Sequence, residues 1–387
     1  MMGDKVKGEG VMSNESGIAD SGSLITHDRL SITDYPRVAI IILNWNGWKD
    51  TIECLESLYR ITYPNYDVIV VDNGSEDDSI EKIKEYCEGK IKVESKFFEY
   101  SSENKPIKVI EYTREEAETG GKEEDIEGLP SNRRLILIKN EKNYGFARGN
   151  NIGMKYALKT LNPDYILLLN NDTVVDKRFL EHAVEVMGKR DIGIVTGKIY
   201  YYDDPQRIWA AGGRINMLFG SGGGVGHNQL DKGQFNEIKE VQYAPGTLAL
   251  IRRSILEQVG FLPECYFGTG EEMEFAIKTM KKGYKIICNP NCIIFHKVGM
   301  SSNRSLKYRY NSWRTKLLFL ERNFPKPFRK LWLILYRMLI EGYLKFIKKD
   351  YKELDIFLLA VQDHNLRKFI VEEDLSKAEV YLGEKWR

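Results

Sequence analysis

The feature that most constrains this chain is a set of four short apolar runs, each of which ends in asparagine or aspartate. The clearest is Tyr-Ile-Leu-Leu-Leu at residues 165–169, which stops at Asn170, Asn171 and Asp172. The other runs are residues 38–43 before Asn44 and Asn46, residues 67–71 before Asp72 and Asn73, and residues 135–138 before Asn140 and Asn143. Such runs are typical of buried strands in a parallel sheet, whose carboxyl ends share one edge. We therefore expect these polar residues to line one crevice.

Helical patterns separate the runs. From Asp50 onward, Ile52, Leu55 and Leu58 recur on one helical face. After the second run, Ser75 or Asp77 is placed to cap a further helix. Strand and helix therefore alternate, which predicts an α/β fold with a doubly wound, mostly parallel sheet.

Changes in composition mark the boundaries of this predicted domain. Residues 1–35 are rich in Gly, Ser and Asp without a continuous apolar stretch, which predicts a disordered tail and not a signal peptide. The sheet domain is predicted over residues 36–303, and residues 304–387 are predicted to form a basic, aromatic-rich helical region.

The alternation is interrupted at residues 93–133, which we interpret as a surface insertion. Within it, residues 93–100 and 107–112 alternate as expected for a hairpin. The acidic, glycine-containing segment 115–128 follows and is predicted to be solvated.

Composition also limits the partners and the compartment. With 57 basic and 56 acidic residues, the bulk charge does not predict binding to nucleic acid. Five cysteines without a CxxC pair fit reduced thiols in a cytoplasmic protein. No uncharged apolar stretch of about 18 residues indicates a membrane span.

Basic and aromatic residues are interleaved between Arg304 and Lys352. Within this segment, residues 328–347 place apolar side chains on a broad helical face with cations on the other side. Two interpretations remain open. The helix lies in the interface of a membrane, at its inner face, or it docks on the main domain.

Two groups of glycines suggest close approach of other atoms. Gly145, Gly149 and Gly153 recur every fourth residue, which leaves one helical face open to another backbone or a phosphate. They do not form the GxGxxG fingerprint of nicotinamide cofactor sites. Seven glycines in residues 211–227 are followed by no Lys-Ser/Thr and are not a P-loop, so a mobile flap and a plain flexible loop remain open.

Three further residues are candidates for chemistry. Glu271 and Glu272 begin a helical pattern, where they either complement the helix dipole or supply a general base. His296 ends an apolar run and is either a structural histidine or a metal ligand.

Taken in order, these blocks resemble the inverting glycosyltransferases of family 2, and most closely their rhamnosyltransferase-like branch. The resemblance covers residues 36–320 approximately and excludes the 93–133 insertion. The blocks that carry it are Asn44-Trp45-Asn46, residues 71–75 (VDNGS), residues 143–151 (NYGFARGNN), Leu169-Asn170-Asn171-Asp172, Pro245-Gly246-Thr247, residues 267–274, and His296 followed by Ser301.

The resemblance implies a GT-A fold, with a Rossmann-like nucleotide-binding half, an acceptor half and C-terminal helices. It implies that Asp72 contacts the nucleobase or ribose of the donor. Asn170-Asn171-Asp172 matches the Asp-x-Asp element that binds a divalent cation, although Asn replaces its first Asp. His296 matches a position that can complete the metal site in relatives. The donor-binding residues that we predict are Asn44, Asn46, Asp72, Asn73, Asn143, Gly145, Arg148, Asn150 and Asn171.

The implied reaction transfers a sugar from a nucleoside-diphosphate sugar to a hydroxyl of a glycan or lipid-linked acceptor. Such chemistry calls for a hard cation, Mg²⁺ or Mn²⁺, to stabilise the leaving diphosphate. Asp172, Asn170 and His296 are the expected ligands. A carboxylate must accept the acceptor proton, and Glu272 is the candidate, with Glu271 not excluded.

Two other functions remain open. A sugar-phosphate nucleotidyltransferase would need a glycine-rich basic loop after the first strand, and residues 44–48 contain no cation. A binding module without catalysis would fit the Asn at position 170 and the Glu at position 272, which depart from the usual aspartates.

Overall fold

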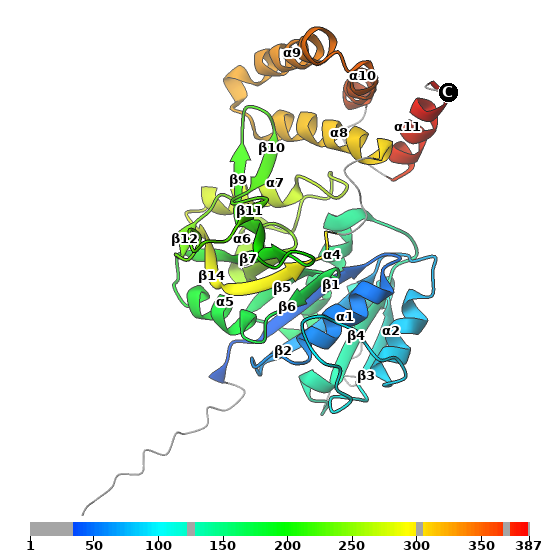
Figure 1. The fold of residues 1–387 in the computed structure, drawn as a ribbon, viewed down its shortest axis with the longest axis vertical. Helices are drawn as coiled ribbons and strands as arrows, with labels where there is room; N and C mark the ends of the chain where they lie inside the picture. Colours follow the sequence, from blue (N-terminus) through cyan, green and yellow to red (C-terminus); the bar gives the residue numbers. More distant parts are fainter. Residues whose placement is uncertain (1–33, 122–127, 299–304, 367–371, 386–387) are drawn as a thin grey trace, which may run out of the picture.

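The computed structural model describes residues 34–121, 128–298, 305–366 and 372–385. A large sheet runs through the main domain in the order β11-β8-β7-β13-β5-β1-β2-β4-β3 (Figure 1). From β5 to β3, every neighbouring pair is parallel. These strands are β1 (Val38–Asn44), β2 (Tyr66–Asp72), β3 (Lys108–Thr113), β4 (Arg134–Lys139) and β5 (Tyr165–Asn170). The parallel α/β arrangement predicted from the four apolar runs is confirmed.

The other half of the sheet is mixed. β13 (Leu248–Arg252) runs antiparallel to β5, and β14 (Lys285–His296) is parallel to β7 (Ile192–Tyr201) but antiparallel to β6 (Thr173–Val175). The remaining strands of this half are β8 (Arg207–Ala211), β11 (Gln229–Leu230) and β12 (Lys239–Glu240). Because β13 is antiparallel to β5, the residues just before β13 meet the carboxyl end of β5.

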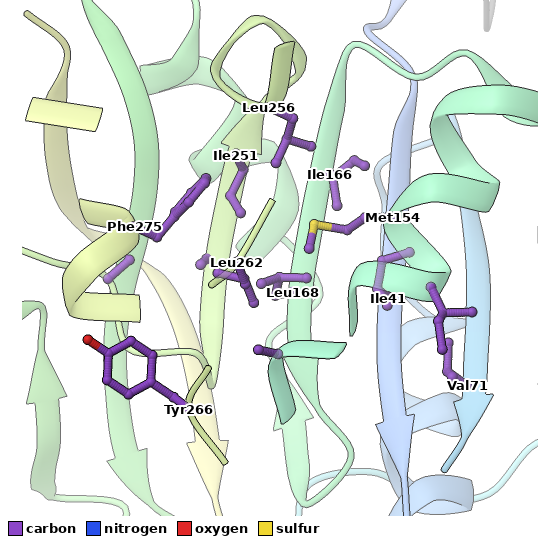
Figure 2. Packing of buried hydrophobic residues seen from close by; sticks show 14 of the residues in the cluster. Ile41, Val71, Met154, Ile166, Leu168, Ile251, Leu256, Leu262, Tyr266 and Phe275 are labelled. Carbon is purple, nitrogen blue, oxygen red and sulfur yellow. The ribbon is translucent and has the colours of Figure 1, made fainter. Parts of the chain in front are cut away.

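Helices cover both faces of the sheet, which confirms the doubly wound fold. Alternate residues of one strand serve the two sides: Ile40 packs in the cluster of α1, α2 and α5, and Ile41 in the cluster of α4, α6 and α7. Figure 2 shows the second cluster, with Met154 of α4 and Phe275 of α7 over the strands. Each such fully buried side chain contributes about 1.5–3 kcal/mol of hydrophobic stabilisation. The helices are α1 (Trp48–Leu58), α2 (Ser79–Cys87), α4 (Gly145–Tyr156), α5 (Phe179–Met187), α6 (Arg253–Val259) and α7 (Glu271–Lys281).

The glycine face of α4 allows this helix to approach the sheet closely. A Cβ at Gly149 would lie 2.5 Å from the Leu43 side chain, and one at Gly153 would lie 2.8 Å from Ile41. The space beside these glycines is therefore filled by side chains of β1. The sequence had suggested another backbone or a phosphate there.

The predicted hairpin in residues 93–133 is wrong. Residues 93–100 form no strand, and β3 instead pairs in parallel with β4 at the edge of the main sheet. β3 buries Ile110 and Tyr112, and Phe97 stacks on Phe295 of β14 at 4.0 Å. This part of the insertion thus extends the core. Short helices α3 (Arg114–Thr119), η3 (Ser131–Arg133) and η4 (Ala157–Leu161) complete this region, and residues 122–127 lie outside the described part.

The glycine-rich residues 211–227 contain a two-stranded hairpin, β9 (Gly213–Asn216) and β10 (Ser221–Gly224). It packs on the main domain, because a Cβ at Gly222 would lie 2.7 Å from Met273 of α7 and 2.8 Å from the Tyr243 hydroxyl.

The C-terminal region is helical, as predicted, and sits beyond one end of the sheet (Figure 1). Its helices are α8 (Leu306–Asn323), α9 (Lys326–Gly342), η5 (Tyr343–Lys348), α10 (Tyr351–Leu366) and α11 (Glu372–Lys385). α8, α9 and α10 share a core of Leu317, Leu320, Tyr336, Leu344 and Phe357. None of the described helices is both long and apolar enough to cross a bilayer. The predicted tail lies outside the described residues as far as residue 33, and so does Ser301.

Candidate active site

The strand ends meet as the sequence predicted. In the register of the sheet, Asn44 lies beside Asp72, and Leu43 lies beside Asn170. Asp72 in turn lies beside Lys139, the residue before Asn140. The Asn and Asp residues that follow β1, β2, β4 and β5 therefore share one edge.

Asp72 is the hub of a buried hydrogen-bond network. Its carboxylate accepts hydrogen bonds from Asn44 Nδ2 at 2.7 Å and from the backbone N–H and hydroxyl of Ser75 at 3.0 and 2.6 Å. Asn44 also accepts from the Thr51 hydroxyl at 2.7 Å. Asp72 is 1% exposed, so it fixes the loop after β2 as well as lying at the crevice.

Asn46 shapes the neighbouring loop. It adopts a left-handed backbone (φ 51°), and its side-chain oxygen accepts from the N–H of Glu76 at 2.8 Å. Its own N–H donates to the Ser75 hydroxyl at 2.9 Å. Asn46 thus links the end of β1 to the turn after β2.

A second amide network ties β2 to the start of α4. Asn73 donates to Asn143 at 2.8 Å and accepts from Asn140 at 3.0 Å, while Asn143 accepts from the Gly145 N–H at 2.9 Å. A Cβ at Gly145 would lie 2.9 Å from the Phe267 ring, which explains the glycine. Hydrogen bonds therefore connect the end of β2, the end of β4 and the start of α4.

The other predicted residues of α4 differ in surroundings. Arg148 is exposed, with its guanidinium 4.3 Å from the centre of the Tyr144 ring. Asn150 is buried and donates to the Phe146 carbonyl of its own helix at 2.9 Å. Asn151, which we did not single out, donates to the Leu262 carbonyl and to Glu264, each at 2.9 Å. Its place in the NYGFARGNN block was the only signal for it.

The Asn170-Asn171-Asp172 element points its three side chains to different partners. Asn170 approaches the Thr247 hydroxyl at 3.5 Å, and Asn171 donates to the Thr51 hydroxyl at 3.0 Å. Asp172 Oδ1 lies 3.1 Å from His296 Nε2. His296 is 6% exposed, its Nδ1 has no hydrogen-bond partner among the described residues, and Trp209 packs edge-on against its ring at 4.7 Å.

This pair fits a divalent cation. Two ligands about 2.1 Å from an octahedral ion stand about 3.0 Å apart when they are adjacent, close to the 3.1 Å that separates Asp172 and His296. Among the described residues, no group of three or more His, Cys, Asp or Glu gathers around one point. A cation here would therefore need ligands other than a third His, Cys, Asp or Glu of the described residues.

Lys297, which the sequence did not highlight, supports this corner. Its ammonium pairs with Asp50 at 2.6 Å and with Glu53, and its N–H donates to the Asp172 carbonyl at 2.9 Å. Tyr202 donates to Glu53 at 2.7 Å. The network joins α1 to the end of β14.

Glu271 and Glu272 begin α7 but lie in different surroundings. Glu271 is 1% exposed, and neither of its carboxylate oxygens has a hydrogen-bond partner in the described part of the chain. Burial, and then the charge of Glu272, raise the pKa of Glu271 well above its usual range. Glu272 is less buried and lines a small cavity with Phe146, Gly246 and Phe275. Burial raises the pKa of Glu272 as well.

The cavity of Glu272 and the Asp172–His296 pair belong to the same edge of the sheet. Gly246 lines the cavity, and the next residue, Thr247, accepts from the Asn170 N–H at 3.2 Å. Asn170 is two residues from Asp172. The short segment before β13 therefore connects the two groups.

The C-terminal region comes near this site. Burial and the charge of Glu272 raise the pKa of Tyr308 in α8, so that helix reaches the neighbourhood of Glu272. Burial and the charge of Glu272 also raise the pKa of Tyr243. Tyr243 lies two residues before the Pro245-Gly246-Thr247 block, but nothing in the sequence indicated Tyr308.

α8 is anchored to α7 by Glu274. This buried carboxylate accepts from Arg322 Nε and Nη2 at 2.7 Å each and from Tyr266 at 2.8 Å, and pairs with Lys278 at 2.9 Å. Although burial alone would raise it, these donors hold the pKa of Glu274 at about 2. Asn311 of α8 also donates to the Phe267 carbonyl at 2.8 Å. α8 thus holds the loop that precedes α7.

Several known proteins are similar to this chain. The hexosyltransferase Agl10 of low-salt glycan biosynthesis in Haloferax volcanii is 26% identical over 152 residues, which are 39% of this chain and 48% of that one. This chain therefore matches only about half the length of that relative. The dolichyl N-acetyl-alpha-D-glucosaminyl phosphate 3-beta-D-2,3-diacetamido-2,3-dideoxy-beta-D-glucuronosyltransferase of Methanococcus voltae is 23% identical over 328 residues, 80% of this chain and 83% of that one.

A solved structure is also similar in outline. The mannosyltransferase PcManGT of Pyrobaculum calidifontis, in complex with GDP-mannose and Mn²⁺, aligns over 92% of this chain and 80% of its own, with 16% identity and a TM-score of 0.49.

The sequence profile described as glycosyl transferase family 2 matches residues 39–105 and 112–260, more than half of the chain. The matched part includes nearly all of β1, the whole of β2, β4 and β5, the polar ends of these strands and the segment before β13, whereas most of β3 lies outside it. The expected GT-A fold and enzyme class are confirmed at the level of the family, while the rhamnosyltransferase-like branch stays a prediction. The chain belongs to glycosyl transferase family 2.

Proposed function

We propose that this chain is a metal-assisted, inverting glycosyltransferase that moves a sugar from a nucleoside-diphosphate sugar to a hydroxyl of a glycan or lipid-linked acceptor. The observation that carries the proposal is the arrangement of Asp172, His296 and Glu272 along one edge of the sheet. The family match favours it over a nucleotidyltransferase.

On the donor side, the nucleotide lies over the ends of β1, β2 and β4. The amide networks of Asp72 and Asn73 hold Asn44, Asn46, Asn143 and Gly145 in fixed places, which reduces the entropy lost on binding. Arg148 is exposed at the same end of α4 and supplies a positive charge for the diphosphate. Asn150 and Asn171 contribute by holding α4 and the β5 loop.

Asp172 and His296 would hold a Mg²⁺ or Mn²⁺ ion, with Asn170 nearby. Such an ion supplies charge stabilisation for the leaving diphosphate. Asp172 Oδ1 and His296 Nε2, which lie 3.1 Å apart, are the two atoms that would hold it. Lys297 keeps the Asp172 backbone in place through the 2.9 Å hydrogen bond to its carbonyl.

On the acceptor side, Glu272 takes the proton from the attacking hydroxyl. Its raised pKa suits a general base, because a more basic carboxylate accepts a proton more readily. Glu271, which burial keeps neutral, leaves Glu272 as the charged member of the pair. A single displacement with one base inverts the anomeric centre.

The names of relatives support the acceptor class. One is a hexosyltransferase of glycan biosynthesis, and another acts, by its name, on a dolichyl-phosphate-linked sugar. The five cysteines are free, buried thiols, as is usual in a reducing compartment. We therefore place the reaction on the cytoplasmic side of a membrane that carries the acceptor.

Titration of a panel of nucleoside diphosphates with and without Mn²⁺ tests this proposal. We expect one of them to bind at least about tenfold more tightly with Mn²⁺, and Asp172→Asn to remove that gain. Asp176→Asn, four residues further on, is the matched control. If no nucleotide binds more tightly with the metal, the proposal is wrong. Hydrolysis of the matching donor sugar then separates an enzyme from a binding module without catalysis.

A further inference from the structure

The outward side of α9 and η5 carries large apolar side chains. Phe328, Leu331, Met338, Leu339, Phe346 and Ile347 are each between 59% and 74% exposed. Scattered apolar residues are normal on a protein surface, but a continuous row of this size marks an interaction site. We call these six residues the apolar face.

The apolar face is separate from the side by which α9 docks on its neighbours. Tyr336 and Leu344 point inward and are 1% and 2% exposed, in a core with Leu320 of α8 and Phe357 of α10. The helix is therefore docked mainly on α8 and α10, and not on the main domain as one sequence interpretation held, and it still presents a second apolar side. Docking within the chain does not explain that second side.

The tip of the β9–β10 hairpin contacts α9 and carries two further exposed apolar side chains. Leu218 and Phe219 at this tip are 51% and 47% exposed. Trp332 of α9 donates to the Leu218 carbonyl at 2.9 Å, and the Phe219 ring lies 6.4 Å from that of Tyr336. Figure 1 shows this hairpin reaching from the main domain to the C-terminal helices. The hairpin tip thus meets α9, the helix that carries most of the apolar face.

The charged residues around the apolar face indicate what kind of partner binds there. Residues 326–349 contain seven Lys and Arg residues and one acidic residue, Glu341. Lys330, Lys345 and Lys349 are exposed. A second copy docked here by two-fold symmetry would set these cations against their own copies. An anionic bilayer instead accepts the apolar side chains and attracts the cations.

The surface also borders the acceptor side of the site. A cavity of about 540 Å³ is lined by Leu218, Gly222, Arg214 and Gln242. Leu218 belongs to the exposed hairpin tip, and Gly222 packs against Met273, the residue after Glu272. The lining of the cavity therefore includes the exposed hairpin tip and contacts the first turn of α7, which carries the proposed base.

We propose that the apolar face, together with the hairpin tip, inserts into the interface of an anionic lipid bilayer. In that position the Arg214 cavity opens toward the lipid headgroups, where a sugar carried on a lipid phosphate reaches Glu272. The second part rests on the proposed function, whereas binding to the bilayer does not.

Sedimentation of the full chain with vesicles tests the proposal. We expect binding to vesicles of equal parts phosphatidylcholine and phosphatidylglycerol, weaker binding to phosphatidylcholine alone, and a loss at high salt. Leu331→Asp with Met338→Asp should weaken binding about tenfold or more. Val380→Asp on α11, which removes an equally exposed apolar side chain elsewhere, should leave it unchanged.

Three controls keep the result interpretable. Circular dichroism and the melting temperature check folding, and Phe346→Ser is a milder second variant because Phe346 is 70% exposed. The oligomeric state is measured in parallel: a dimer that the double variant dissociates, without vesicle binding by the wild type, would overturn the proposal.

Nucleotide binding without vesicle binding contradicts this inference alone. Vesicle binding without nucleotide binding supports docking and contradicts the proposed function.

Discussion

The two sides of the crevice hold their buried carboxylates in opposite ways. Asp72, after β2, accepts three hydrogen bonds from Asn44 and Ser75. Glu271, at the start of α7, is just as buried, but its oxygens have no hydrogen-bond partner in the described part of the chain. A buried carboxylate with several donors is stabilised as an anion, whereas one without donors is stable only as the neutral acid.

From this difference we infer that the β2 side of the crevice is rigid, whereas the α7 side takes part in proton transfer. The amide networks at β2 and α4 fix backbone and side chains before any ligand arrives. At α7, two neighbouring glutamates have raised pKa values, and the proposed mechanism assigns the acceptance of the hydroxyl proton to one of them. Substitutions on the β2 side should therefore cost stability, and substitutions at Glu272 should cost rate.

The largest expected effect is on catalysis. Glu272→Gln should lower the rate of transfer at least about 100-fold, because the amide cannot accept the proton of the acceptor hydroxyl. Nucleotide affinity should change little. Initial rates and nucleotide titration measure the two quantities, with Glu257→Gln on the surface of α6 as the control. An unchanged rate of transfer by Glu272→Gln would show that Glu272 is not the general base.

On the β2 side, Asp72→Ala should lower the free energy of unfolding by about 3 kcal/mol, because it leaves Asn44 and Ser75 without their buried acceptor. Urea denaturation measures this. Asp203→Ala, at a side chain that is 91% exposed, is the matched control and should change stability little. Equal free energies of unfolding for the two variants would mean that the hydrogen bonds of Asp72 do not stabilise the fold.

Glu271 predicts a pH dependence with a definite sign. Its pKa is raised on folding, so the folded state binds more protons than the unfolded state as pH rises above about 4.5, the ordinary pKa of glutamate. Its contribution to stability therefore falls with rising pH. Glu271→Gln should remove this decrease in the free energy of unfolding, which amounts to up to about 1.4 kcal/mol per pH unit. Denaturation of both proteins at pH 5 and pH 7 tests it; parallel pH profiles would contradict the neutral state of Glu271.

The smallest effect concerns the anchor of α8. Arg322→Leu should lower the free energy of unfolding by about 1 kcal/mol, because Glu274 keeps Tyr266 and Lys278 and because Arg322 is partly exposed. Arg253→Leu removes a similar pair whose glutamate is exposed and should cost less. The melting temperatures of the two variants can be compared directly. A larger loss for Arg253→Leu would show that α8 is not held by Glu274.

Local patterns in the sequence predicted the parallel half of the fold well. Strand length, apolar content and terminal Asn or Asp residues are properties of each run by itself, and they located β1, β2, β4 and β5. The hairpin in residues 93–133 failed for a physical reason. Alternation along one segment does not say which strand it pairs with, and β3 finds its partner in β4, more than 20 residues later.

The site was predictable as a set of residue types but not as a set of contacts. The sequence placed Asp72 at the crevice, but not the Ser75 hydroxyl that occupies its carboxylate. Tyr308 comes to Glu272 only because Arg322 and Asn311 dock α8 against the loop before α7. Contacts between distant segments of this kind leave no local signal.

A crystal structure with a nucleoside-diphosphate sugar and Mn²⁺ tests the central claim most directly. We predict the diphosphate and the ion beside Asp172 and His296, the base over the ends of β1 and β2, and the sugar turned toward Glu272. A nucleotide bound away from this edge, with Asp172 still in direct contact with His296, would contradict the account.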